Sequence, residues 1–105
     1  MRGLCKEPVD STRIRKMPRQ FGAIDRSLIY QGHIQKLCTE ETALYALLIC
    51  VSDPQGLSYY SDRRLCELLR LSNEAVLRAR LGLIRNGFIL YERPFYQLLD
   101  LPAAP

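Results

Sequence analysis

The clearest hydrophobic pattern in the chain is the apolar run over residues 43–51, which predicts a helix that is buried on several sides. Thr39 precedes this run as an N-cap, and Glu40 and Glu41 are favourably placed in the first turn. The turn-forming segment 53–56 ends the run. We expect this helix to be the central packing helix of the fold.

Two more helices are predicted after it, separated by a tight turn. Ser61 is an N-cap for the first, Arg70-Leu71 breaks the pattern, and Ser72 is an N-cap for the second, which runs over residues 72–86 to Gly87. Their predicted inward positions are Leu65, Cys66, Leu68 and Leu69 in the first helix and Val76, Ala79 and Leu83 in the second.

Short runs rich in aromatic and branched residues predict three strands, over residues 57–60, 88–92 and 95–99. The last two flank Arg93-Pro94 and predict a hairpin. Proline is awkward as the second residue of a two-residue loop, so either the loop is longer or the Arg93-Pro94 bond is cis.

The two ends of the chain lack these patterns. Residues 1–20 predict a flexible basic arm, residues 102–105 a disordered tail, and residues 21–101 the folded domain. Apolar positions between residues 24 and 37 predict a first short helix or turn that is interrupted near Gly32.

The order strand, helix, tight turn, helix and hairpin resembles a winged helix domain. The stretch LIRNGFI, residues 83–89, resembles the passage from recognition helix to wing in the winged helix-turn-helix superfamily of bacterial regulators and plasmid-type replication initiators. The resemblance covers roughly residues 39–101 and implies a mainly α fold with a small β-hairpin wing. Arg70 departs from the family, which often has glycine in a left-handed backbone at this turn.

The net charge of +4 is unevenly distributed along the chain. Residues 1–20 hold six basic and two acidic side chains, and the rest of the chain is neutral. Within that neutral part, residues 63–85 carry six arginines against Glu67 and Glu74. Such clusters neutralise phosphates, although a solvated tail without a partner is an equally weighted interpretation of the arm.

The resemblance implies a DNA-binding protein, a transcriptional regulator or an accessory factor of a plasmid or transposon. The helix over residues 72–86 is then expected in the major groove, with the wing, residues 88–99, and the arm on the backbone. We expect duplex DNA to be bound by a homodimer, because a single small DNA-binding domain gives limited affinity. The candidate DNA-binding residues are Arg63, Arg64, Ser72, Asn73, Leu77, Arg78, Arg85 and Arg93 in the domain and Arg13, Arg15 and Lys16 in the arm.

A second apolar stripe supports another use of the same helix. It consists of Leu77, Leu81 and Ile84, and the nearby Glu74 has the wrong sign to face phosphates. If the stripe is exposed, it predicts a protein partner that binds through Leu77 and Leu81, and the domain is then an interaction module in a nucleoprotein complex. Arg80 is expected near the core as the ion-pair partner of Glu67 or of a wing carboxylate.

Other chemistry has little support in the sequence. Cys5, Cys38, Cys50 and Cys66 are widely spaced, so neither a metal site nor another cofactor is expected. Cys50 and Cys66 are expected as small buried hydrophobes in a reduced, cytoplasmic protein. No window approaches the ~18 apolar residues that cross a membrane.

Neither an enzyme nor a base-stacking surface is predicted. His33 accompanies no recognisable nucleophile motif, so we expect an ordinary, partly exposed histidine and no enzyme. Several aromatic residues are candidates for stacking on single-stranded nucleic acid, but packing in the core and hairpin is the favoured use of most of them. They are Tyr59, Tyr60, Tyr91, Phe95 and Tyr96.

Overall fold

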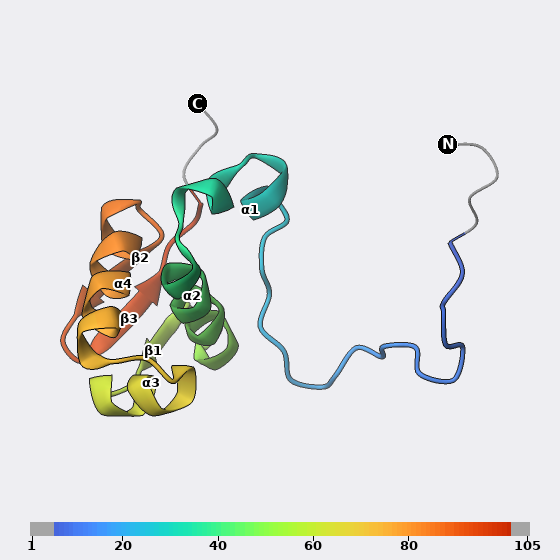
Figure 1. Cartoon of the computed structure of the whole chain (residues 1–105), viewed down its shortest axis with the longest axis horizontal. Coiled ribbons are helices and arrows are strands. Elements are labelled where there is room, and N and C mark those ends of the chain that lie inside the picture. The colour runs from blue at the N-terminus through green and yellow to red at the C-terminus, as the bar shows by residue number, and fades with distance from the viewer. Residues whose placement is uncertain (1–5, 102–105) are drawn as a thin grey trace.

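The computed structural model describes residues 6–101, in which helices pack against a small antiparallel sheet (Figure 1). The helical elements are α1 (Ser27–Tyr30), the 3-10 helix η1 (His33–Lys36), α2 (Thr39–Val51), α3 (Asp62–Leu69) and α4 (Asn73–Arg85). The strands are β1 (Leu57–Tyr59), β2 (Ile89–Glu92) and β3 (Phe95–Leu98). This is the mainly α fold with a small β-hairpin wing that the sequence predicts. The predicted tail and the first five residues of the arm lie outside the described residues.

Helix α2 is the packing helix at the centre of the fold. Its N-cap is Cys38, whose backbone N–H donates to the Glu41 carboxylate at 2.8 Å, and not Thr39 as predicted. The side of α2 that contains Leu48 and Ile49 is buried. Cys50 is exposed, contrary to expectation, because it follows Ile49 by one position, about 100° around the helix axis.

Both predicted serine caps of the helix pair are confirmed. The hydroxyl of Ser61 accepts the N–H of Arg64 at 3.1 Å, and the hydroxyl of Ser72 accepts the N–H of Ala75 at 3.1 Å. Between them, Arg70 ends α3 in the left-handed conformation, with φ 57 and ψ 44.

The inward side of α3 is narrower than predicted. Leu65 is fully buried, but Leu68 is 44% exposed, so the expectation that it faces inward is wrong. The reason is that α3 is short and reaches the core mainly through the side that contains Leu65.

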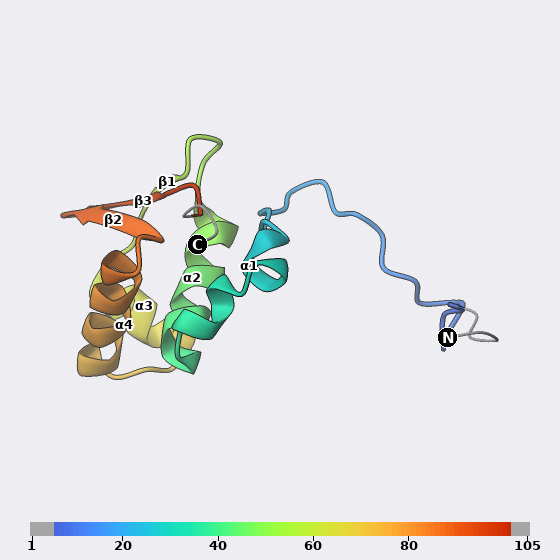
Figure 2. The same cartoon turned by 90° about the horizontal axis from the view of Figure 1, so that it is seen from above.

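The three strands form a sheet in the order β1-β3-β2, with both pairs antiparallel. Figure 2 shows α2, α3 and α4 on one side of this sheet. The side chains alternate accordingly: Ile89 and Tyr96 are buried, whereas Leu90 and Phe95 are about half exposed. Arg93 and Pro94 connect β2 to β3 through a cis peptide bond, one of the two predicted alternatives.

The core includes His33, a residue predicted to be partly exposed. His33 is 1% exposed, and its ring meets that of Phe88 edge-on with the centroids 6.4 Å apart. Neither ring nitrogen has a hydrogen-bond partner among residues 6–101. The expected partial exposure is wrong, because α1 and η1 fold back over the core beside Phe88.

Two broader features complete the fold. In the part of the chain that the structure describes, no helix is both long and apolar enough to cross a membrane. Among the same residues, no group of three or more histidine, cysteine, aspartate or glutamate side chains is arranged to hold a metal ion.

Candidate nucleic-acid interface

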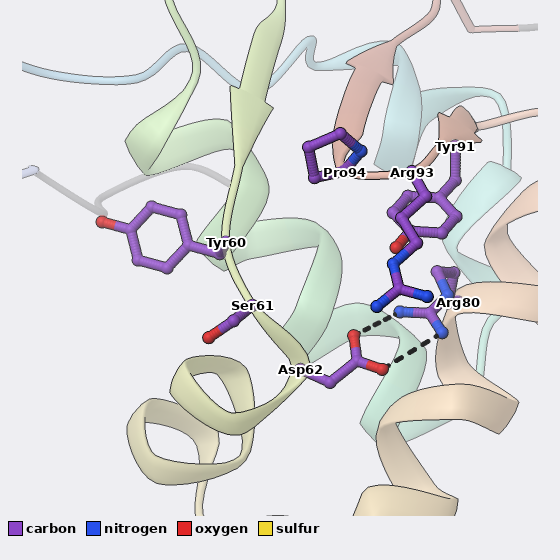
Figure 3. A pocket seen from close by; sticks show the side chains of 7 residues that line it. All are labelled: Tyr60, Ser61, Asp62, Arg80, Tyr91, Arg93 and Pro94. Carbon is purple, nitrogen blue, oxygen red and sulfur yellow. Dashed lines mark hydrogen bonds and ion pairs between the residues drawn. The ribbon is translucent and has the colours of Figure 1, made fainter.

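The side chain of Arg80 joins α4 to the start of α3 and to the hairpin (Figure 3). It is only 7% exposed, and its Nη1 donates to Asp62 Oδ1 at 2.7 Å and to Tyr96 Oη at 2.9 Å. The guanidinium carbon also lies 4.4 Å from the ring centroid of Tyr91, a cation-π geometry. Burial acts to lower the pKa of Arg80, but the hydrogen bonds to Asp62 and Tyr96 more than offset it and leave the pKa raised. The buried group therefore keeps its positive charge.

The carboxylate partner of Arg80 differs from the expected ones. We predicted Glu67 or a wing carboxylate, and the structure places Asp62 there instead. The reason is the crossing of the two helices, which brings the first residue of α3, rather than its middle, against the middle of α4. Only the tertiary arrangement reveals this pair.

A cavity of about 500 Å³ opens beside this network, between the start of α3 and the hairpin. Figure 3 shows Arg93 reaching from the hairpin tip into this space, above Asp62 and Arg80. The structure thus brings Arg93 close to Asp62 at the start of α3; Arg63 and Arg64 follow in the same turn but do not line this cavity.

The first turn of α3 presents a net positive charge to solvent. Arg63 and Arg64 are both exposed, and neither forms an ion pair with another of residues 6–101. Asp62, the carboxylate in this turn, is already bound to the buried Arg80. Two unneutralised guanidinium groups therefore stand at a helix N-terminus, which itself favours anions.

The outward face of α4 is mixed in character. Leu77 and Leu81 are 47% and 50% exposed, and Glu74 is exposed in the first turn. Arg78 is exposed but lies 3.8 Å from the carboxylate of Glu40 at the start of α2. The candidate DNA-contact position Leu77 therefore belongs to an exposed pair with Leu81, next to the carboxylate of Glu74.

The N-terminal end of α4 contains two further candidate residues with local roles. Ser72 is exposed and caps the helix through its hydroxyl, as described above. Asn73 is exposed, and its side-chain oxygen accepts a hydrogen bond from the Cys66 thiol at 3.1 Å. Arg85, at the opposite end of α4, is also exposed.

The described part of the arm is exposed along its length, including Arg13, Arg15 and Lys16. It leaves the domain beside α1 and runs away from it, on the side opposite α4 and the hairpin (Figures 1 and 2). The structure therefore does not bring these arm residues together with Arg63, Arg64 and Arg93.

Two of the candidate stacking residues, Tyr59 and Phe95, form an aromatic pair on the outer face of the sheet. Tyr59 and Phe95 are cross-strand partners, are 65% and 54% exposed, and meet edge-on with ring centroids 5.7 Å apart. Packing in the core and hairpin is the predicted use of most of these aromatic residues; Tyr96 is in the core, whereas this pair packs across two strands on the exposed face. The signal was the period-two alternation, which places Phe95 and Tyr96 on opposite faces.

No protein-family model matches the chain, and no curated protein matches it significantly. Among solved structures, the chain is similar to one described as "Structure of Rep-DNA complex", with a TM-score of 0.57 and 22% sequence identity. The match covers 81% of this chain and 78% of that one. At this level of identity, the likeness establishes a shared fold.

Proposed function

We propose that this protein is a DNA-binding domain that holds duplex DNA mainly through its phosphates. The observation that carries the proposal is the start of α3, where Arg63 and Arg64 are exposed and Asp62 is neutralised by Arg80. A helix N-terminus with two such guanidinium groups suits a phosphate backbone, since arginine binds phosphate in a bidentate manner. The fold shared with a protein described in complex with DNA supports this use.

Two further elements add positive charge to the proposed interface. Arg93, at the hairpin tip, lies beside the same cavity and extends the surface from α3 to the wing. The exposed arm, with Arg13, Arg15 and Lys16, is a second phosphate-binding element on another side of the domain. An arm of this kind reaches DNA that the body has already bound, and it contributes affinity without sequence preference.

The proposal does not depend on base reading by α4. Asn73 and Arg78 on this helix are retained as predicted DNA contacts. The proposed biological role is that of a transcriptional regulator or an accessory factor of a mobile element. Glu74, Leu77 and Leu81, however, occupy the middle of the outward face, so we assign most of the binding energy to phosphate contacts. The proposed role is binding, without a catalytic step.

The test is a salt titration of binding to duplex DNA by the wild type and by Arg63→Gln/Arg64→Gln. Removing one arginine–phosphate interaction reduces the slope of log affinity against log salt by about 0.9. We expect the double variant to bind more weakly and its slope to fall by up to about two units. The matched control is Arg26→Gln/Lys36→Gln, which removes the same charge from exposed positions just before α1 and at the end of η1. Equal losses of affinity in both variants would mean that net charge, and not the start of α3, determines binding.

A second candidate function is a protein-interaction module within a nucleoprotein complex. The exposed Leu77 and Leu81 favour it, because paired leucines on an outward helix face are suited to another protein surface. Absence of binding to duplex DNA at low salt would favour this function over the first.

A further inference from the structure

The outward face of α4 carries a regular four-residue stripe, which we call the α4 stripe: Glu74, Leu77, Leu81 and Arg85. Spacings of three, four and four residues place these side chains on one side of a helix. The opposite side of α4 is buried through Val76, Ala79 and Leu83. The α4 stripe therefore faces away from the domain, and both of its leucines are about half exposed.

The charges at the two ends of the stripe are opposite. Glu74 lies in the first turn of α4 and Arg85 in the last. Neither forms an ion pair with another of residues 6–101, whereas their neighbour Arg78 lies near Glu40 and Arg80 binds Asp62. An apolar centre with an acidic end and a basic end is complementary to a copy of itself turned end to end.

We infer that the α4 stripe is a dimer interface on which a second copy of this chain docks with its own α4 antiparallel. A two-fold axis through the middle of the stripe places Leu77 against the partner's Leu81 and, within one residue of register, Glu74 against the partner's Arg85. Such a contact is isologous, so it closes at two copies. The antiparallel arrangement also sets the two helix dipoles in the favourable opposite sense.

The parallel arrangement and duplex DNA both fit the stripe less well. Parallel helices place Glu74 against Glu74 and Arg85 against Arg85, so that like charges repel at both ends. A DNA groove places the carboxylate of Glu74 beside phosphates, and it gives the leucines little apolar surface to cover. Charge complementarity therefore favours a second copy as the occupant of this face.

The predicted interface is small, because it consists mainly of one helix face from each copy. Interfaces that bury less than about 1,200 Å² in total belong to weak or transient complexes. We therefore expect a reversible, concentration-dependent dimer. The inference goes beyond DNA binding and is tested on the full chain without DNA, so that its failure is distinguishable from failure of the proposed function.

The experiment is sedimentation equilibrium over a wide concentration range, with charge-reversed variants. Glu74→Arg and Arg85→Glu each create like-charge contacts in the dimer and are expected to weaken dimerisation by roughly tenfold or more. The double variant Glu74→Arg/Arg85→Glu exchanges the two ends and is expected to restore dimerisation. Because both single changes also oppose the helix dipole, circular dichroism confirms that every variant is folded, and Glu74→Gln and Arg85→Gln provide milder versions.

The matched control uses two leucines of equal exposure. Leu81→Lys, in the stripe at 50% exposed, is expected to abolish dimerisation, whereas Leu90→Lys, on the outer sheet face at 51% exposed, leaves it unchanged. A wild type that stays monomeric at the highest concentration, or a double variant that remains as weak as the single ones, overturns the inference. A monomeric wild type whose affinity for duplex DNA rises with Glu74→Arg overturns it too, and assigns this face of α4 to DNA.

Discussion

The guanidinium group of Arg80 and the carboxylate of Asp62, eighteen positions apart in the chain, meet at 2.7 Å and hold α4 against the start of α3. This pair sets the charge of the proposed interface, since it removes Asp62 from competition with phosphates. It also ties in the hairpin, because the same guanidinium binds the hydroxyl of Tyr96. A single buried cation thus connects the three elements on which the proposed function depends.

The first prediction concerns the stability that Arg80 provides. Arg80→Met is expected to lower the free energy of unfolding by about 2–4 kcal/mol, because it leaves the buried Tyr96 hydroxyl without its partner and removes the ion pair. Urea denaturation measures this change. Arg85→Met, at an exposed position of the same helix, is the control and is expected to change stability by no more than about 0.5 kcal/mol. Similar effects of the two substitutions would contradict the structural role of Arg80.

The second prediction concerns the left-handed residue between α3 and α4. Arg70 has a positive φ of 57, a conformation that costs a side-chain-bearing residue more than glycine. Arg70→Gly is therefore expected to raise the free energy of unfolding by about 0.5–1 kcal/mol, seen as a higher melting temperature. Arg64→Gly, inside α3, is expected to lower stability by about 1 kcal/mol. Destabilisation by both changes would show that the turn gains nothing from glycine.

The third prediction concerns the buried ring of His33. Both of its nitrogens are buried and lack hydrogen-bond partners among residues 6–101, which disfavours the folded state. His33→Leu keeps most of the volume and removes the polar atoms, so it is expected to stabilise the fold by about 1 kcal/mol. His33→Ala is expected to destabilise it through the cavity that it leaves. A leucine variant as unstable as the alanine variant would indicate that the ring nitrogens are satisfied in solution.

The fourth prediction concerns stability at alkaline pH. Burial raises the pKa of Tyr45 above its usual value of 10.0, and the negative charge of Asp25 adds to this. Because the folded state holds the proton more tightly, the stability from this group is fully present below about pH 10 and is lost as the pH rises through the raised pKa. Tyr45→Phe is expected to lose less stability between about pH 9 and pH 11 than the wild type.

Denaturation at a series of pH values measures this difference. Tyr59→Phe, at an exposed position on β1, is the control. If the pH profiles of the Tyr45→Phe protein and the wild type run parallel through this range, the prediction is wrong.

The helix pair was predictable because its signals are local. Ser61 and Ser72 act on N–H groups three residues away, and Arg70 occupies the residue between two hydrophobic patterns. Interactions of this kind depend only on backbone geometry within one turn. The order of elements and the class of fold follow from them.

The predictions that were wrong concern burial, which depends on contacts between distant parts of the chain. Leu68 and Cys50 are apolar positions on helices whose packed sides are narrower than their hydrophobic content suggested. The burial of His33 depends on how η1 folds back towards Phe88. Neither helix propensity nor hydrophobic periodicity gives the distances between helices and strands, and those distances decide whether such residues are buried.

The sequence by itself therefore determined the order of the helices, turns and strands and the serine caps of α3 and α4, because those choices depend on neighbours within a few residues. Only the tertiary structure decided that Asp62 is the partner of Arg80, that Arg93 lies over the same pair, and that Leu77 and Leu81 face outward between Glu74 and Arg85. These relationships depend on the crossing of α3 and α4 and on which side of α4 the rest of the chain covers, and packing of the whole core sets both.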